Sequence, residues 1–175
     1  IYARNEGAVV APTAGFHFSR ELVKRMEIKG IDSAYVTLHS GLGNFRAIEV
    51  EDLTKHKMDS EQMEINEQNA NLINKTKEKE NKVCIVGTTT MKAVETAAIT
   101  GNRVKVYSGW SNKFIFPHYN FDIADAMITN FHPPLSSMLM MVSAFGGYDL
   151  IMEAYKHAVE KEYKFLTYGD AMLII

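Results

Sequence analysis

The chain is poor in the residues that build disulfide scaffolds, linkers and membrane spans. It has one cysteine, Cys84, and four prolines among 175 residues, so no disulfide can form within it. A single thiol fits a reducing compartment, and we expect a cytoplasmic protein. No apolar run approaches the ~18 residues of a transmembrane helix, so we expect no membrane partner. These absences exclude a disulfide-rich secreted module.

An excess of charge of one sign is also missing. The chain has 19 Lys and Arg against 21 Asp and Glu, which gives a net charge of -2. A general nucleic-acid-binding domain would be clearly basic, although an enzyme with a local basic patch remains compatible. No His-x₃-His or Cys-x₂-Cys spacing occurs, so we expect no metal site. The composition, 46 % hydrophobic and 23 % charged, is typical of a globular domain.

Predicted strands and helices alternate along the chain. Apolar periodicity and the capping residues Ser19 and Asn66 predict helices over 20–29, 67–80, 91–99, 135–145 and 149–162. Strands are predicted at 31–39, 45–50, 61–65, 83–86, 103–107, 113–116, 125–131, 163–168 and 171–175. The thiol of Cys84 is expected to be buried in its strand as a small hydrophobic group. This alternation predicts an α/β fold, a mixed sheet or barrel-like α/β domain with packed helices.

The clearest local site is the junction Gly87-Thr88-Thr89-Thr90 between a strand and a helix. Free backbone N–H groups and the positive end of the helix dipole favour an anion there. Three hydroxyls add hydrogen-bond donors, and Lys92 adds charge one turn later. The same residues also fit a threonine that caps an ordinary helix, and the sequence favours neither interpretation.

Three histidines follow turns or predicted strands. His17 lies between two phenylalanines after a Pro-Thr-Ala-Gly turn, and this local pattern slightly favours a packed core residue. His39 ends a strand before a glycine-rich loop, and His132 follows another strand. Strand ends in α/β sheets border ligand crevices. We therefore expect His39, Thr88 with Thr89, and Asn130 with His132 to converge at one site.

Several stretches, in order and from end to end, resemble the S-adenosylmethionine:tRNA ribosyltransferase-isomerases of queuosine biosynthesis. The stretches are Ala11–Phe18 (APTAGFHF), Val36–His39 (VTLH), Gly41–Gly43 (GLG), His56–Met58 (HKM) with Ser60-Glu61, Val86–Thr89 (VGTT), Ile128–His132 (ITNFH), Val142–Phe145 (VSAF) and Tyr168–Leu173 (YGDAML). Each stretch alone is weak evidence, whereas the ordered set is highly specific.

The resemblance implies that the chain is part of a larger two-domain protein. Family members are about twice this length, so residues 1–175 correspond to the C-terminal part of the α/β catalytic domain. The family's smaller β-barrel domain, inserted in the N-terminal half, is expected upstream. The missing initiator at Ile1 agrees with this interpretation. An isolated half would expose apolar surface, so we expect the 175 residues alone to self-associate.

The activity implied by the resemblance is the transfer of a ribosyl group. The ribosyl part of S-adenosylmethionine, the co-substrate, moves onto the aminomethyl group of a 7-deazaguanine at the tRNA wobble position. Isomerisation gives epoxyqueuosine, and adenine and methionine leave. The implied partner is a tRNA with a queuosine-type anticodon that carries this deazaguanine precursor. No metal is required.

The resemblance and the strand-end placement together give the candidate site residues. The candidate catalytic residues are His17, His39 and His132, with the carboxylates Glu61 and Asp170. The candidate substrate-binding residues are Thr13, Gly15, Phe16, Gly41, Gly43, Phe45, Gly87, Thr88, Thr89, Lys92, Asn130 and Tyr168. Departures from the family pattern at Asp59, Lys92 and Leu135 favour an alternative function. In this alternative the chain is a divergent non-catalytic or changed-function relative that binds S-adenosylmethionine, a nucleoside or RNA. A generic α/β transferase that binds phosphate at the threonine-rich helix start is a further alternative.

Overall fold

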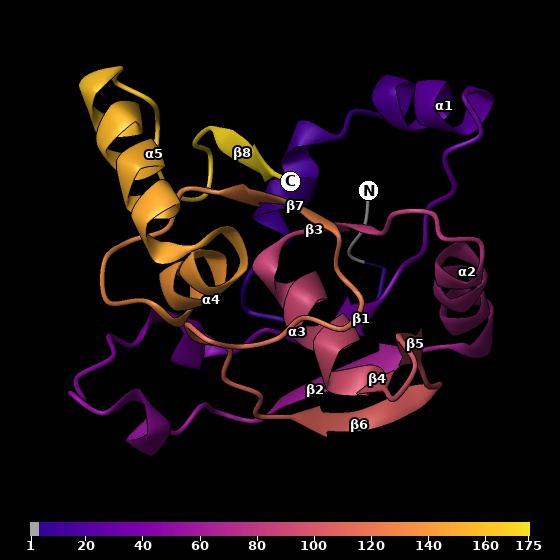
Figure 1. Cartoon of the computed structure of the whole chain (residues 1–175), viewed down its shortest axis with the longest axis horizontal. Helices are drawn as coiled ribbons and strands as arrows, with labels where there is room; N and C mark the ends of the chain where they lie inside the picture. Colours follow the sequence, from indigo (N-terminus) through magenta and orange to yellow (C-terminus); the bar gives the residue numbers. More distant parts are fainter. Residues whose placement is uncertain (1–3) are drawn as a thin grey trace.

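Two three-stranded sheets lie on opposite sides of one helix in the computed structural model, which describes residues 4–175 (Figure 1). The helix is α3 (Thr88–Ala97). The first sheet has the order β3-β7-β8, formed by Cys84–Val86, Ala126–Asn130 and Ala171–Ile174. The second has the order β1-β2-β6, formed by Thr37–Leu38, Glu61–Ile65 and Tyr107–Ser111. The α/β prediction with a mixed sheet is confirmed, and the sheets formed by residues 4–175 close no barrel.

The first sheet places the junction before α3 beside the end of β7. Strands β3 and β7 are parallel, with Val86 opposite Ile128, and β8 is antiparallel to β7, with Asn130 opposite Ala171. Parallel strands have their carboxyl ends at the same edge of a sheet. Gly87, which follows β3, therefore lies at the edge where β7 ends, and its N–H donates to the Ile128 carbonyl at 2.8 Å.

The second sheet is antiparallel and turns alternate side chains toward α3. In β2 the side chains of Glu61, Met63 and Ile65 are buried, whereas Gln62 and Glu64 are exposed. This is the period of two that the strand geometry imposes. A charged residue thus occupies the inner face of a strand, where apolar residues are usual.

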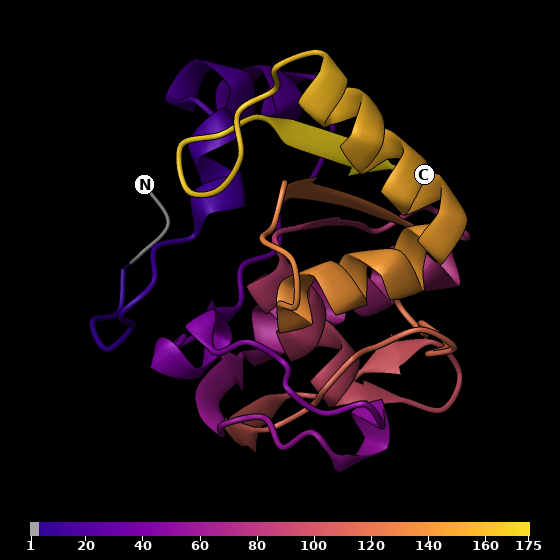
Figure 2. The ribbon, with the colours of Figure 1, turned by 90° about the vertical axis from the view of Figure 1, so that its left-hand side faces the viewer.

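Side-chain caps start two of the helices as predicted. The Ser19 hydroxyl accepts from the Leu22 N–H at the start of α1 (Arg20–Ile28), and the Asn66 carbonyl oxygen accepts from the Asn69 N–H at the start of α2 (Glu67–Glu78). Helices α4 (Ser137–Gly146) and α5 (Tyr148–Glu160) pack together on the side of the first sheet (Figure 2). The remaining elements are the ribbon of β4 (Ala98–Ile99) with β5 (Arg103–Val104) and the 3₁₀ turns η1 (Thr13–His17), η2 (Leu42–Phe45) and η3 (Leu53–Lys55).

Some predicted strands are wrong, and their backbone explains why. Residues 45–50 begin in the turn η2, and residues 163–168 contain Leu166 at φ +70, a left-handed conformation that breaks an extended strand. The pairing strand near residue 113 lies earlier, at Tyr107–Ser111, and the strand predicted at 31–39 is only two residues long. Cys84 is exposed, because its side chain points to the face of β3 opposite to the buried Ile85, so its predicted burial is also wrong.

Candidate functional site

The end of β7 gathers one set of candidate residues, which we name the Asn130 cluster: Thr13, His17, Asn130, Gly169 and Asp170. The buried Asn130 side chain accepts from the Thr13 hydroxyl at 3.1 Å and lies 3.2 Å from His17 Nε2. Its Nδ2 also donates to the Gly169 and Asp170 carbonyls, both at 3.3 Å. A buried amide thus joins η1 to the loop before β8, whereas His17 itself is exposed.

Two exposed aromatic rings stand next to this cluster. The rings of Phe16 and Tyr168 are stacked, with centroids 6.0 Å apart and an interplanar angle of 19°. Phe16 is 50 % exposed and Tyr168 is 87 % exposed. The next residue, Gly169, packs against the backbone of residues 164 and 165, so a Cβ there would collide with the Lys164 carbonyl. Exposed aromatic faces are the surfaces on which nucleic-acid bases stack.

The start of α3 lies against η1 and has no side-chain cap. Gly87 is the residue before the helix, at φ +90, and no side chain among the described residues caps the helix there. A Cβ at Gly87 would lie 3.6 Å from the Ala14 Cβ, which places η1 beside this helix start. The first N–H groups of a helix lack partners within the helix. Because the cap is a glycine, Thr88, Thr89 and Thr90 do not serve as an ordinary threonine cap, and the anion site stays a prediction.

A buried ion pair ties α3 to the turn at residues 41–44. Lys92 Nζ lies 2.7 Å from Glu61 Oε2, and the two side chains are 4 % and 5 % exposed. Glu61 Oε1 accepts from the Gly41 N–H at 2.9 Å and from Asn44 Nδ2 at 2.7 Å. The positive charge expected from Lys92 at the anion site is therefore neutralised by Glu61.

His39 is fixed through its backbone by the neighbouring strand. Its N–H donates to the Gln62 carbonyl at 2.8 Å, and its half-buried ring lies against Gly7. Of the nearby loop, Gly43 lies against the Asp59 carboxylate, and Phe45 is exposed. His39 follows a strand of the second sheet and Asn130 ends a strand of the first, so the two do not lie at one shared sheet edge as expected.

His132 and His17 lie on opposite faces of β7. His132 Nε2 shares a hydrogen bond of 2.8 Å with the Thr129 hydroxyl, and the His132 N–H donates to Tyr155 Oη at 2.8 Å. Thr129 and Asn130 are consecutive in a strand, so their side chains point to opposite faces. Burial lowers the pKa of His132 to about 4, which keeps its ring neutral at pH 7.

The two candidate carboxylates have partners other than the histidines. Glu61 binds Lys92, Gly41 and Asn44, as described above. Asp170 is exposed, and its Oδ2 accepts from the Lys164 N–H at 2.7 Å. The structure thus brings His17 together with Thr13, Asn130 and the Asp170 backbone, and it brings Lys92 together with Glu61. Gly15 is buried within η1, where its carbonyl accepts from the Phe18 N–H.

The sequence did not predict a second buried carboxylate, Glu95, which lies on α3. Glu95 is 1 % exposed, and its oxygens accept from the backbone N–H groups of Asp122, Ile123 and Ala124 and from the Tyr119 hydroxyl. Burial, reinforced by the Glu95 charge, raises the pKa of Tyr119. The available signal was an acid on a mostly buried helix, near the apolar residues Met91, Ala93, Val94 and Ala97.

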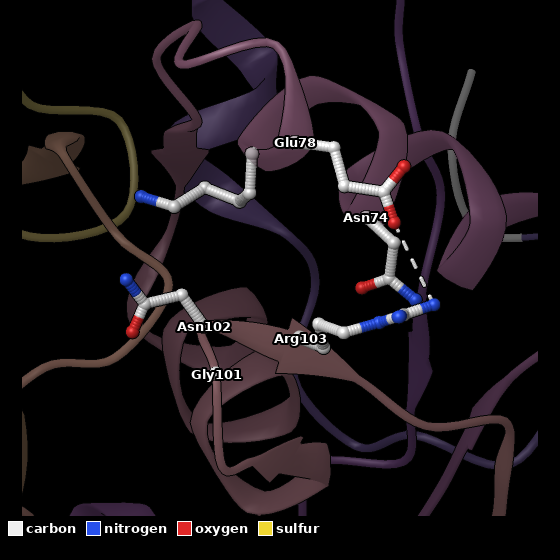
Figure 3. Close-up of a pocket in the computed structure, with 6 residues that line it drawn as sticks. Asn74, Glu78, Gly101, Asn102 and Arg103 are labelled. Atoms are coloured by element: carbon white, nitrogen blue, oxygen red, sulfur yellow. Dashed lines mark ion pairs between the residues drawn. The ribbon is translucent and has the colours of Figure 1, made fainter.

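Two hollows among the described residues are lined by none of the candidate site residues, although Phe131 and Ala171, which line the second, adjoin Asn130 and Asp170 in sequence. One, of about 170 Å³, is lined by Asn74, Lys77, Glu78, Gly101, Asn102 and Arg103. Figure 3 shows Arg103 extending toward Glu78 across it, with Nη2 3.6 Å from Oε1. A second hollow lies between α5 and β8. Among residues 4–175, no three His, Cys, Asp or Glu side chains gather closely enough to hold a metal ion, and no helix is long and apolar enough to span a bilayer.

The fold and the site define an α/β protein whose uncapped helix start is flanked by an exposed histidine and exposed aromatic rings. A family model described as queuosine biosynthesis protein matches residues 1–174. The chain is 62 % identical over 175 residues to the S-adenosylmethionine:tRNA ribosyltransferase-isomerase of Phocaeicola vulgatus, covering all of this chain and 50 % of that protein. It is 56 % identical to the protein of the same name from Flavobacterium psychrophilum, with the same coverage.

A solved structure agrees with these relatives. The crystal structure of S-adenosylmethionine tRNA ribosyltransferase from Thermotoga maritima superposes with a TM-score of 0.77 at 37 % identity, covering 93 % of this chain and 52 % of that one. The chain belongs to the queuosine biosynthesis protein family. It spans about half the length of the curated relatives that it matches.

Proposed function

We propose that this chain is the C-terminal part of the α/β catalytic domain of an S-adenosylmethionine:tRNA ribosyltransferase-isomerase. The complete protein would transfer the ribosyl moiety of S-adenosylmethionine to the aminomethyl-deazaguanine at the tRNA wobble position. The product would be epoxyqueuosine, with release of adenine and methionine. The observation that carries this proposal is 62 % identity along the whole chain to relatives that bear this enzyme's name.

The reaction places three demands on the groups around the co-substrate. A base removes the proton from the carbon next to the sulfonium, whose positive charge makes that proton acidic. An acid protonates the departing adenine, and the attacking amine has to be neutral. Groups with a pKa near the operating pH serve both proton transfers best, and histidine is the usual choice.

His17 is our first candidate for one of these proton transfers. Its ring is exposed beside the stacked aromatic pair, and the buried Asn130 orients its Nε2. His39, fixed against β2, is the second candidate. His132 is neutral at pH 7, because burial lowers its pKa to about 4, so it carries no proton to give as an imidazolium and is only a weak base. The exposed Asp170 carboxylate remains a candidate partner.

The start of α3 is our candidate for binding the methionyl carboxylate. Its first N–H groups have no side-chain cap, and the hydroxyls of Thr88 and Thr89 are half-exposed there. The positive end of the helix dipole would stabilise the carboxylate by up to about 1 kcal/mol at an exposed site. Because Glu61 neutralises Lys92, the helix start itself supplies the attraction.

Exposed aromatic rings are our candidates for binding the flat bases. Phe16, Phe45 and Tyr168 present ring faces to solvent. Base stacking on such rings contributes about 1–3 kcal/mol per base. The wobble base of the tRNA would be splayed out of the anticodon loop to reach this surface, as sequence-specific RNA recognition commonly requires.

Product release from the complete protein tests the proposal. The protein is incubated with S-adenosylmethionine and tRNA that carries the aminomethyl-deazaguanine, and adenine and methionine are quantified by chromatography. We expect both products in equal amounts, and none with tRNA that has guanine at the wobble position. Binding of S-adenosylmethionine by calorimetry without product release would instead identify a binding-only relative and overturn the proposal.

A further inference from the structure

Glu61 is a buried carboxylate with donors from two separate parts of the chain. Oε2 accepts from Lys92 Nζ at 2.7 Å. Oε1 accepts from the Gly41 N–H at 2.9 Å and from Asn44 Nδ2 at 2.7 Å. One side chain on β2 therefore connects the turn at residues 41–44 with helix α3.

These contacts leave Glu61 unsuited to proton transfer with a substrate. Both of its oxygens are occupied, and its side chain is 5 % exposed. Its ammonium partner is 4 % exposed. A charge pair buried this deeply is held by its hydrogen bonds, and removing one partner leaves the other charge uncompensated. A substrate would have to displace these donors before it reached the carboxylate.

The pair instead connects two candidate binding segments. Lys92 is one helical turn after Thr88, so both side chains are on the same face of α3. The neighbouring residue of β2, Gln62, accepts the His39 N–H at 2.8 Å. Residues 39–44 are thus fixed against β2 by a backbone bond at His39 and by the Glu61 carboxylate at Gly41 and Asn44.

We propose that Glu61 and Lys92 are positioning residues that hold the 39–45 segment at a fixed distance from the start of α3. The proposal rests on the proposed function for its activity readout only. In this role Glu61 is neither acid nor base. Its negative charge pairs with Lys92 and accepts hydrogen bonds from the turn at residues 41–44. The half-exposed Thr88 and Thr89 and the exposed Phe45 would then border the co-substrate from two segments whose separation this pair fixes.

A charge-removal cycle in the complete protein tests this assignment. The variants are Glu61→Gln, Lys92→Met and the double variant. Glutamine keeps an acceptor for Gly41 and Asn44, and methionine fills the space of the lysine stem without its charge. Each single variant leaves one buried charge or a facing pair of donors unpaired, whereas the double variant leaves only the neutral amide at position 61 facing the methionine sulfur, a weak acceptor. The matched control is the exposed pair of Glu78 and Arg103, changed in the same way.

Two readouts are taken on each variant, and turnover is expressed per folded molecule. The first is hydrogen exchange of the Gly41 amide, and the second is kcat and KM for S-adenosylmethionine. In each single variant we expect Gly41 exchange to accelerate at least about 10-fold and kcat/KM to fall at least about 10-fold, which corresponds to about 1.4 kcal/mol. In the double variant we expect both values to return to within about threefold of wild type. The control variants should change neither value.

Three results would overturn the assignment. The first is a double variant that regains Gly41 protection but not turnover, because Glu61 would then take part in the chemistry. The second is a double variant that regains neither, and the third is a Glu61→Gln variant that loses neither. If Glu61→Gln does not fold, the double variant still decides between these results. If the wild-type protein releases no adenine, the proposed function fails, and Gly41 exchange alone decides the positioning role.

Discussion

The Asn130 cluster and the Glu61–Lys92 pair both adjoin α3, and they differ in how fully their groups are occupied. In the Asn130 cluster the hydrogen bonds are 3.1–3.3 Å long, and His17 and the neighbouring rings are exposed. In the Glu61–Lys92 pair the bonds are 2.7–2.9 Å long and the side chains are buried. Groups that remain accessible are available to a substrate, and groups that are fully paired fix the shape around it.

Glu95 is, like Glu61, a buried carboxylate whose oxygens are fully paired, and it gives the largest expected effect. Changing Glu95 to Ala leaves the backbone N–H groups of residues 122–124 without their acceptor. Each unsatisfied buried donor costs about 1–3 kcal/mol, so we expect the free energy of unfolding to fall by about 4 kcal/mol. Urea unfolding of the complete protein measures this loss. Glu153→Ala, at an exposed position of α5, is the control and should change stability by less than about 0.5 kcal/mol. Equal stabilities would show that Glu95 is not what holds residues 122–124.

His132 tests whether its side of β7 is buried as well. Its pKa is lowered from the ordinary 6.5 to about 4 by burial, so the unfolded chain binds its proton at a higher pH than the folded one. Its stability contribution is complete above pH 6.5 and is lost as the pH falls through about 4, in total about 3 kcal/mol. Between pH 4 and 7 the free energy of unfolding should therefore rise more steeply with pH for wild type than for His132→Gln. Equal slopes would mean that His132 is as accessible to solvent as His17.

His17 tests the accessible side of the comparison directly. Changing it to Ala should lower single-turnover adenine release at least about 100-fold, since a true acid or base contributes about that much. Its ring is exposed, so the free energy of unfolding should change by less than about 1 kcal/mol. The matched control is His157→Ala, which changes an exposed histidine on α5 and should leave turnover normal. A near-normal rate for His17→Ala would remove the Asn130 cluster from the chemistry.

Tyr168 should give the smallest effect. It is 87 % exposed, so its change to Ala should leave stability unaltered. Loss of one stacking surface should weaken binding of the precursor tRNA about 10-fold, measured by filter binding. Tyr148→Ala removes an exposed ring from the start of α5 and should bind tRNA as wild type does. Equal weakening by both variants would contradict a specific role of the stacked pair Phe16 and Tyr168 in tRNA binding.

Local signals predicted much of the fold, and long-range pairing explains what they missed. The caps Ser19 and Asn66 and the alternation in Glu61–Ile65 depend on neighbours in sequence, and those elements are confirmed. The strands predicted at 45–50 and 163–168 had suitable side chains but no strand to pair with. The prediction for Cys84 was wrong because the sequence does not show which face of β3 other elements cover.

The candidate site shows the same limit at the level of contacts. The sequence predicted that the strand ends at Thr88 and Thr89, at Asn130 and at His39 converge; the parallel pairing of β3 with β7 joins the first two, whereas His39 follows a strand of the other sheet. The sequence did not predict that Glu61 pairs with Lys92, because the two are 31 residues apart and on different elements. The catalytic roles of the histidines remain a prediction.

The central claim is that the co-substrate binds between η1, the turn at residues 41–45 and the start of α3. Hydrogen exchange of the complete protein with and without S-adenosylmethionine tests it most directly. The account predicts added protection at the amides of residues 13–18, 41–45 and 88–90, and none at residues 122–124, which Glu95 already binds. Protection confined to the hollow around Asn74 and Arg103, with residues 88–90 unchanged, would contradict it.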